Sequence, residues 1–510
     1  MTVVLQADRP LTEAEVVDVA RQRAAVDISP ESLDRLRAAR GAVDELAASS
    51  TPVYGVSTGF GALATRHIPP TQRTQLQRSL VRSHAASSGA EVEEEVVRGL
   101  MLLRLQTMTT GRTGVQPETA SAYAALLNAG ITPVVREFGS LGCSGDLAPL
   151  AHAALAVMGE GDVRVDGRLT TAADALAAAG IAPVVLAEKE GLALINGTDG
   201  MLAMLMLSCL DLSLLARTAD LTAAMSLEAL LGTDRVLAAD LMALRPQLGQ
   251  GLAAANMRRI LEGSAIVASH RGPEDTRVQD AYSVRCAPQV AGGLRDTIAH
   301  ARLVAQREAA SAIDNPVLLP DGRLESNGNF HGAPLAYVLD FLAIPAADVA
   351  SISERRTDRL LDPNRSHGLP AFLAGDPGVD SGLMIAQYTQ AGLVSELKRL
   401  AVPASVDSIP SSAMQEDHVS MGWSAGRKLR RAVDALTRVL AIELMTAARA
   451  LDLRADAPAA ATAAAVDALR AVVPGPGPDR YLTPEIEAAV SLVRSGAVLS
   501  AVEAVTGPLE

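Results

Sequence analysis

The chain contains few aromatic side chains. Its 510 residues include only five Phe, six Tyr and one Trp, although 49% of the residues are hydrophobic. The apolar mass is therefore mainly Ala, Leu, Val and Met. Strands of β-sandwiches are rich in β-branched and aromatic residues, whereas Ala and Leu favour helices. This composition argues against a β-sandwich and predicts a mainly α protein with a very small β content.

Positive charge and cysteine are also scarce. The formal net charge is −13, so the chain lacks the basic surface that nucleic-acid binding requires. The three cysteines, Cys143, Cys209 and Cys286, form neither a paired framework nor a CxxC motif, which is typical of a reducing compartment. Residues 1–20 lack the basic-then-apolar pattern of a secretion signal. We therefore expect a cytoplasmic protein that binds no nucleic acid.

One long apolar segment, residues 201–216, needs a separate explanation. It is interrupted by Ser208 and Asp211 and is shorter than the roughly 20 residues of a membrane span. A helix that is apolar on every side is otherwise buried in a protein core. We therefore expect no membrane span here. The segment instead predicts a long helix over 199–231, in the centre of a bundle that is shared between subunits.

Most of the remaining chain shows helical spacing of apolar residues. The predicted helices are 96–108, 117–129, 252–263, 294–312, 334–352, 383–400, 428–453 and 458–473, followed by a closing helix that starts at Pro484. Strand candidates are few, and 163–165 and 181–186 are expected to pair as a small appendage. Polar clusters gather in the loops, where function usually lies on a rigid scaffold.

The most informative motif is the run Gly142-Cys-Ser-Gly-Asp-Leu-Ala-Pro-Leu-Ala-His152. Ser144 or Asp146 could cap the following helix. The same letters also suit backbone cyclisation, because the nitrogen of Gly145 can attack the carbonyl carbon of Cys143 when no Cβ blocks the turn. Loss of two waters would leave an exposed methylidene, an electrophile that no encoded side chain supplies. The positive end of the helix would strengthen that electrophile, so the two interpretations are compatible.

Two further motifs lie upstream of this run. The glycine-rich segment from Tyr54 to Gly61 has no following Lys and matches neither a P-loop nor GxGxxG. A mobile loop whose tyrosine removes a proton fits it better, although a buried structural tyrosine is the simpler alternative. His84 follows Arg82 and Ser83, and it could equally be an ordinary core or surface histidine.

Downstream motifs complete the set. Asn196 precedes the long apolar helix and could be either a turn residue or a functional amide. Arg285 near Tyr282 suits a carboxylate ligand, since guanidinium binds carboxylate in a bidentate fork, but an interface ion pair is an alternative. Phe330 lies in a polar loop, which is unusual for a core residue. Glu416 belongs to a Gln-Glu-Asp-His run without HExxH or a second His at ligand spacing, so we expect no metal site.

Taken together, these motifs resemble the histidine ammonia-lyases, within the aromatic amino acid ammonia-lyases. The resemblance runs from Tyr54 to about Met421. It implies a long-helix bundle of the ammonia-lyase or fumarase/aspartase-like type and a homotetramer with active sites shared between subunits. It also implies a 4-methylidene-imidazol-5-one (MIO) group made from residues 143–145, with no external cofactor. We expect an N-terminal helical domain over 1–199 that carries the MIO loop, and an elongated bundle over 200–510 that forms the tetramer core.

The resemblance also implies roles for individual residues. Tyr54 would remove the β-proton, Asn196 would polarise the MIO, and Arg285 would hold the substrate carboxylate. The other site residues implied are Ser144 and Gly145 in the MIO, Tyr282 and Gln279 lining the site, and Phe330 near the MIO. One departure is Cys143, where Ala is commonest in the family. Its side chain lies outside the new ring, so cyclisation should survive, but a thiol beside an electrophile is a candidate for oxidation or covalent modification.

Substrate choice is expected to depend on two places. Relatives that take phenylalanine or tyrosine have Phe-Leu or His-Leu where this chain has Ser83-His84, and they lack the acid found here in Gln415-Glu416. His84 and Glu416 could pair both imidazole nitrogens. A phenyl ring would leave them unpaired, at a cost of about 1–3 kcal/mol each. We therefore expect L-histidine as substrate and trans-urocanate with ammonia as products.

Three alternatives remain open. Another MIO enzyme, either a phenylalanine or tyrosine ammonia-lyase or an aminomutase, would share most of these motifs. A catalytically inactive helical scaffold would more naturally lack Ser144 or Tyr54, and both are present. A fumarase/aspartase-type lyase would need a Ser-Ser-x-Met-Pro loop, which the chain does not contain.

Overall fold

A computed structural model describes residues 2–49, 53–59, 65–272 and 278–510. It divides into two compact units. The first comprises 1–208, 301–340 and 403–427, and the second comprises 209–300, 341–402 and 428–510. The sequence places a domain boundary between 199 and 200. The first compact unit extends to Ser208, within a continuous helix, and includes two later segments, and the division at 199 stays a prediction.

The chain is mainly α with short strands, as the composition predicts. The first unit contains β1 (Thr2–Leu5), α1 (Glu13–Arg21), β2 (Ala25–Ile28), α2 (Pro30–Ala48), α3 (Pro70–His84), β3 (Ser88–Glu91), α4 (Glu94–Thr109), α5 (Pro117–Asn128), β4 (Ile131–Pro133), β5 (Arg136–Phe138), α6 (Leu147–Val157), β6 (Asp162–Val165), β7 (Arg168–Thr171), α7 (Ala172–Ala179), α8 (Glu190–Ile195), β8 (Val317–Leu318), β9 (Leu324–Glu325) and the 3₁₀ turn η4 (Ser412–Met414).

Among its described residues, the second unit contains helices and loops but no strand. It contains η2 (Asp234–Leu237), α10 (Ala239–Ala243), α11 (Leu248–Ile260), α12 (Ala265–Ser269), α13 (Tyr282–Arg285), η3 (Ala371–Leu373), α16 (Met384–Leu400), α18 (Ala460–Arg470), α19 (Thr483–Arg494) and α20 (Ala497–Thr506). Four long helices contribute residues to both units: α9 (Asp199–Ala229), α14 (Ala287–Ala309), α15 (Ala333–Leu361) and α17 (Gly422–Asp452).

The strands form small sheets. The pair β1–β2 is parallel, β3–β5 and β8–β9 are antiparallel, and β6 lies between β4 and β7. The predicted strand at 163–165 is confirmed. The predicted strand at 181–186 is wrong, because both edges of β6 are already paired. The backbone N–H groups of Ile181 and Val184 bond to Leu176 and Val157 instead.

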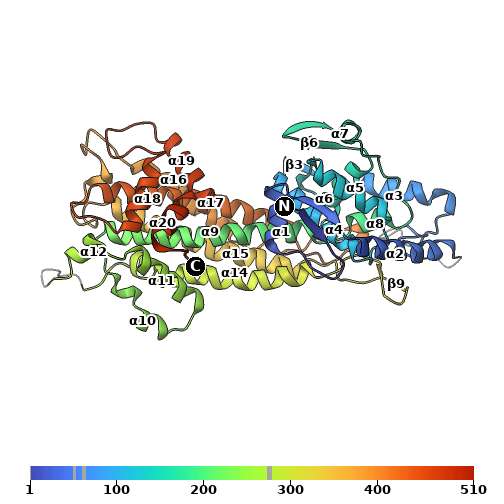
Figure 1. Ribbon diagram of the computed structural model, residues 1–510, viewed down its shortest axis with the longest axis horizontal. Coiled ribbons are helices and arrows are strands. Elements are labelled where there is room, and N and C mark those ends of the chain that lie inside the picture. The colour runs from blue at the N-terminus through green and yellow to red at the C-terminus, as the bar shows by residue number, and fades with distance from the viewer. Residues whose placement is uncertain (1, 50–52, 60–64, 273–277) are drawn as a thin grey trace. The chain divides into compact units, whose positions relative to one another are not determined.

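Helix α4 forms the core of the first unit, where it packs with α1, α5 and α6 (Figure 1). Every residue from Val96 to Thr109 is buried. Two of these residues, Arg98 and Arg104, are fully buried arginines. A buried cation requires hydrogen-bond partners, and both side chains bond to backbone carbonyls of other segments.

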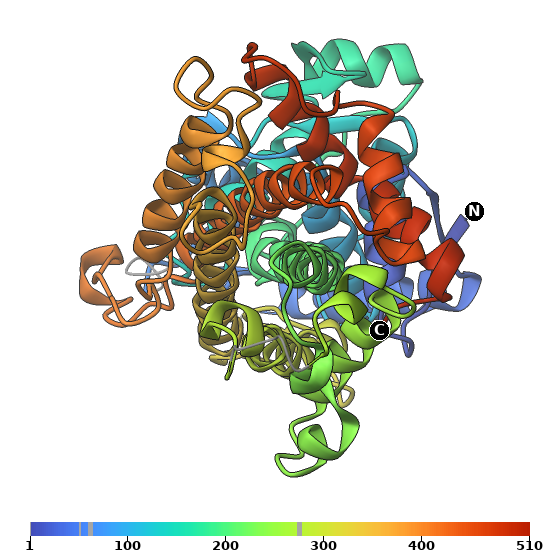
Figure 2. The ribbon, with the colours of Figure 1, turned by 90° about the vertical axis from the view of Figure 1, so that its left-hand side faces the viewer.

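The second unit is built around parts of the four long helices. Figure 2 views them nearly end on, with α9 in the middle and α14, α15 and α17 around it. The buried Glu443 carboxylate of α17 accepts hydrogen bonds from Thr222 and Ser226 of α9 and from Ser353 and Arg356 of α15. These bonds satisfy a charge that would otherwise be costly to bury.

The apolar character of α9 reflects burial in the protein. The helix spans 31 residues, Asp199–Ala229, so the long helix predicted over 199–231 is confirmed. By length and composition alone, α9 and α15 could each cross a membrane. In α9, however, 78% of the most apolar window is buried inside the protein, and in α15 the share is 61%.

Candidate functional site

The residues predicted to cyclise lie in a tight loop, residues 140–146, which we call the 140–146 loop. Gly142 and Gly145 both have positive φ, at +73° and +75°. A Cβ added to Gly145 would lie 2.0 Å from the carbonyl oxygen of Gly197, so no other residue fits there. The N–H of Asp146 donates to that same oxygen at 2.7 Å. The Gly197 peptide therefore fixes one side of the loop.

A distant segment holds the other side of the loop. The N–H of Met421 donates to the Leu141 carbonyl at 3.0 Å, and the Ser420 hydroxyl donates to the Gly142 carbonyl at 3.3 Å. Within the loop, the Ser140 hydroxyl donates to the Gly145 carbonyl at 3.4 Å. The backbone around Ser144 is thus restrained from three directions.

Asp146 occupies the N-cap position of α6, but its side chain makes no capping bond there. The expectation that its carboxyl caps this helix is therefore wrong, and Ser144 does not cap it either. The carboxylate instead accepts from the N–H of Met201 at 2.9 Å, in the first turn of α9, and from the Ser140 hydroxyl at 3.2 Å. Burial raises the pKa of Asp146 to about 7.

This raised pKa predicts a pH dependence of stability. The pKa of Asp146 is about 7 in the folded protein against 3.8 for an ordinary Asp, so its contribution to stability is greatest below pH 4 and is lost as the pH rises towards 7. Asn does not ionise. The Asp146→Asn variant should gain unfolding free energy relative to the parent between pH 4 and 7, by at most about 4 kcal/mol. Urea unfolding of both proteins across this range measures the difference. A constant difference would contradict the prediction.

A cavity of about 550 Å³ opens beside the loop, within the first unit. Side chains or backbone from four segments surround it. The lining residues are Tyr54, Cys143, Ser144, Asn315, Ser326, Gly328, Phe330, His331, Gln415, Glu416, Asp417 and His418. The cavity therefore brings together six of the residues that the sequence predicts for the site, from motifs separated by up to 362 positions in the chain.

Asn196 and Gly145 lie behind this cavity and are buried. The Asn196 amide nitrogen donates to the Asn315 carbonyl at 2.9 Å. Its Oδ1 atom is buried without a hydrogen-bond partner. A buried amide with unused capacity is costly unless a ligand or reacting group satisfies it. The segment around Tyr54 is described only as far as Gly59, so Phe60 and Gly61 of that motif lie outside the described residues.

His84 is not among the residues that line the cavity. It ends α3, where its Nδ1 atom lies 2.9 Å from the Leu80 carbonyl oxygen. Because a carbonyl only accepts, this contact assigns a proton to Nδ1 and leaves Nε2 free to accept in the neutral form. Pairing of His84 with a substrate imidazole remains a prediction.

Three further predicted residues lie in the second unit, where they contact one another. An Arg285 guanidinium nitrogen donates to the Gln279 side-chain oxygen at 2.5 Å. The same guanidinium lies 4.6 Å from the centre of the Tyr282 ring. Such stacking leaves the other guanidinium edges available to a carboxylate.

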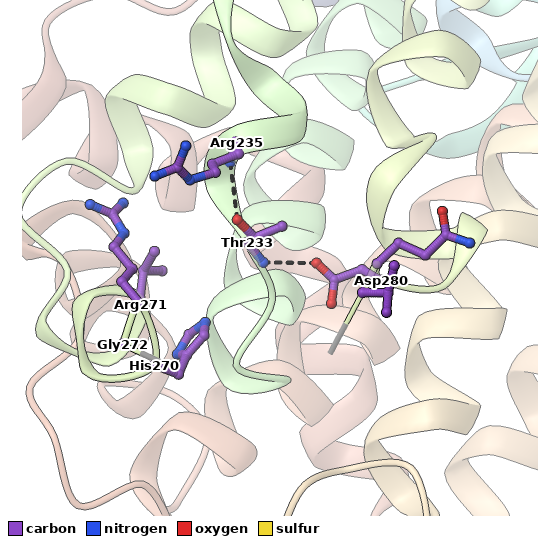
Figure 3. Close-up of a pocket in the computed structure, with 9 residues that line it drawn as sticks. Thr233, Arg235, His270, Arg271, Gly272 and Asp280 are labelled. Atoms are coloured by element: carbon purple, nitrogen blue, oxygen red, sulfur yellow. Dashed lines mark hydrogen bonds between the residues drawn. The ribbon is translucent and has the colours of Figure 1, made fainter. Parts of the chain in front are cut away.

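Gln279 also lines a separate cavity of about 280 Å³ in this unit, shown in Figure 3. There the Asp280 carboxylate accepts from the N–H of Thr233 at 2.8 Å, while the Thr233 hydroxyl accepts from the N–H of Arg235 at 3.3 Å. The bond between Thr233 and Asp280 therefore attaches the residues just before α13 to the start of η2.

Two histidines, His331 and His418, line the first cavity, and no role was predicted for them from the sequence. The rings of His331 and His418 stack with their centres 5.6 Å apart and their planes within 4°. Nε2 of His331 is buried without a hydrogen-bond partner. The sequence analysis placed the motifs of both residues in one site through Phe330 and Glu416, but it did not predict that these two rings stack.

The Cys143 thiol lies close to the Glu416 carboxylate. Burial, together with this carboxylate, raises the pKa of the Cys143 thiol to about 12. The thiolate is the reactive form of cysteine, so the raised pKa lowers the share of the reactive form at neutral pH, and modification of Cys143 stays a prediction. Among the described residues, no group of three or more His, Cys, Asp or Glu side chains could hold a metal ion.

Comparison with known proteins identifies the family. The model of the aromatic amino acid lyase family matches residues 11–471. The chain belongs to this family. It is 66% identical to a histidine ammonia-lyase of Streptomyces avermitilis, over the full length of both chains.

Solved structures of this family share the fold. A tyrosine aminomutase from Streptomyces globisporus has a TM-score of 0.95 at 37% identity over the whole of both chains. A histidine ammonia-lyase from Trypanosoma cruzi has a TM-score of 0.90 at 38% identity, over 99% of this chain and 96% of that one. The mainly α family fold expected from the motifs is therefore confirmed.

Proposed function

We propose that this protein is a cytoplasmic histidine ammonia-lyase, which eliminates ammonia from L-histidine to give trans-urocanate. The observation that carries this proposal is the cavity that places Ser144 and Glu416 together beside Tyr54. The identity of 66% to a protein named histidine ammonia-lyase supports the same substrate.

The residues of the 140–146 loop suit formation of an MIO group. In that reaction, the Gly145 nitrogen bonds to the Cys143 carbonyl carbon and the former carbonyl oxygen leaves as water. Loss of the Ser144 hydroxyl with its α-hydrogen releases a second water and needs no oxidant. Positive φ at Gly142 and Gly145 supports the tight turn that this attack requires. When formed, the MIO supplies an electrophile that activates the substrate's amine as a leaving group.

The side chains around the cavity would bind and orient the substrate. Tyr54 would remove the β-proton, a role that typically contributes about 10²–10⁴-fold to rate. Glu416 would accept a hydrogen bond from the imidazole. Its backbone is paired with Ser411 through N–H···O bonds of 2.9 and 3.3 Å, and the Ser411 hydroxyl donates to its carboxylate at 2.8 Å. Asn196, behind the loop, would offer its remaining N–H to the MIO.

The substrate carboxylate needs a cation, and we assign it to Arg285. Gln279 and Tyr282 contact this guanidinium and would orient it. Tyr282 is 70% exposed in the single chain, which suits a residue that serves a site completed by another subunit. We therefore propose a homotetramer whose active sites combine both units of different subunits, as the family resemblance implies.

The proposal is tested by offering the purified protein L-histidine, L-phenylalanine and L-tyrosine separately. We expect ultraviolet absorbance from urocanate with histidine and a rate at least about 30-fold lower with the others, since two unpaired polar groups cost about 1–3 kcal/mol each. Chromatography of the products would detect β-amino acids, the outcome expected of an aminomutase like the one that shares this fold. Cinnamate, coumarate or a β-amino acid as the main product would refute the proposal.

A further inference from the structure

Arg104 lies directly behind the 140–146 loop, yet it does not line the cavity. It is fully buried on α4, with no exposed surface. One guanidinium nitrogen donates to the Asn196 carbonyl at 2.6 Å and another donates to the Ile313 carbonyl at 2.8 Å. The buried Asp199 carboxylate lies 3.5 Å from its Nε atom. One side chain thus connects two backbone segments that approach the site.

Gly197 lies between this arginine and the loop. A Cβ added to Gly197 would lie 2.7 Å from a guanidinium nitrogen of Arg104 and 2.4 Å from the Asp199 carboxylate. A Cβ added to Gly145 would lie 2.0 Å from the Gly197 carbonyl oxygen. The order in space is therefore Gly145, then Gly197, then Arg104, with no room for a side chain at either glycine. Any displacement of the guanidinium frees the peptide against which Gly145 packs.

The second bond of Arg104 fixes the adjoining wall of the cavity. Ile313, whose carbonyl it binds, is followed by Asp314 and by Asn315, which lines the cavity and accepts from Asn196. The buried Asp314 carboxylate pairs with the fully buried ammonium of Lys189 and also accepts from the N–H of Asn315. The 196–197 turn and the 313–315 segment are therefore held together by buried charges.

We propose that Arg104 is a positioning residue for ring closure: it holds the Asn196–Gly197 peptide against Gly145, so that the Gly145 nitrogen stays within reach of the Cys143 carbonyl carbon. This inference rests on the proposed formation of an MIO. It assigns Arg104 a role in the maturation of the chain, which the guanidinium performs through the Gly197 peptide rather than by lining the cavity.

Arg98 provides a matched control. It lies on the same helix, is equally buried, and also bonds to backbone carbonyls, those of Val19 at 3.0 and 3.1 Å and Leu127 at 3.2 Å. Neither of these carbonyls belongs to the 140–146 loop or to the segments that contact it. A lysine at either position keeps the charge but cannot bond to two carbonyls in the same fork geometry. The Arg104→Lys and Arg98→Lys variants should therefore lower the stability of the fold to a similar extent. They differ in that only Arg104 lies close to the 140–146 loop.

The experiment measures the intact mass of the folded, parent-sized fraction of each variant. In the parent and in Arg98→Lys, ring closure should lower the mass by about 36 Da, the mass of two waters. In Arg104→Lys, the matured share should fall at least about tenfold, since misplacement by about 1 Å can slow a reaction on the order of 10²-fold. Asp199→Asn, which removes the ionic partner of Arg104 with little change of shape, should lower the matured share in the same direction.

Each outcome separates this inference from the proposed function. An unmodified mass in the parent would refute the MIO itself. If the parent has lost two waters and the folded Arg104→Lys variant has lost them completely as well, the role of Arg104 is refuted. If Arg104→Lys yields no folded fraction, Asp199→Asn decides: complete ring closure in that variant counts against the inference, and incomplete closure supports it. Equal maturation defects in Arg98→Lys and Arg104→Lys would show that both act only through the fold.

Discussion

The Ser144→Ala variant should lose at least about a thousandfold in kcat with L-histidine while keeping its fold. Enzymes typically accelerate reactions by about 10⁶–10¹⁷-fold, and a positioned base supplies only about 10²–10⁴ of this. The remainder must come largely from the electrophile that Ser144 alone can provide. Alanine has a β-carbon but no leaving group there, so ring closure could not end in a methylidene. Initial rates of urocanate formation measure the effect.

Two controls keep this result specific. Ser311→Ala removes a hydroxyl that only bonds back to the carbonyl of Arg307 in α14, so its rate should match that of the parent. Circular dichroism and gel filtration of Ser144→Ala should match the parent, because the Ser144 hydroxyl makes no hydrogen bond to the fold in the described structure. Turnover of Ser144→Ala close to that of the parent would refute the cofactor.

The Glu416→Gln variant should lower kcat/KM for L-histidine by roughly 5- to 150-fold, corresponding to about 1–3 kcal/mol. Glutamine keeps the shape and the backbone pairing with Ser411 but loses the negative charge towards the imidazole. Its amide group can also turn an N–H towards the substrate, where a lone pair is needed. Steady-state kinetics with histidine measure the loss.

The neighbouring carboxylate offers a matched comparison. Asp417 is exposed and also lines the cavity, so the Asp417→Asn variant should lose less kcat/KM than Glu416→Gln. Thermal unfolding should be similar in both variants and the parent. An equal loss in both variants, or parent-like efficiency in Glu416→Gln, would contradict the proposed recognition of the imidazole.

Much of the fold could be predicted from the sequence, because the local spacing of apolar residues indicates where helices form. The helices at 117–128 and 384–400 begin and end within two residues of their predicted bounds. The strand predicted at 181–186 failed because an apolar stretch does not reveal that β6 already has a partner on each edge. The length of α17 was underestimated at its start, where Gly422 and Trp423 continue the helix before the periodic apolar pattern begins.

The site residues also divide into those that the sequence predicted and those that it missed. Unusual residue combinations drew attention to Ser144, Tyr54 and Phe330, the family resemblance implied the roles of these residues and of Glu416, and the cavity brings all four together. Arg104 was missed because a single arginine within an apolar helix carries no motif, and its proposed role depends on carbonyl groups 92 and 209 positions away. The stacking of His418 on His331 depends on tertiary structure, so no local pattern predicts it.

The two bonds that Ser420 and Met421 make to the 140–146 loop join segments that are far apart in the chain. A nascent chain on the ribosome has exposed residues 143–145 long before residue 421 is translated. Until then the loop lacks these two bonds, so under the proposed cyclisation we expect dehydration to follow synthesis of residue 421. Under the same proposal, we expect truncated products that end before residue 420 to carry no reactive methylidene.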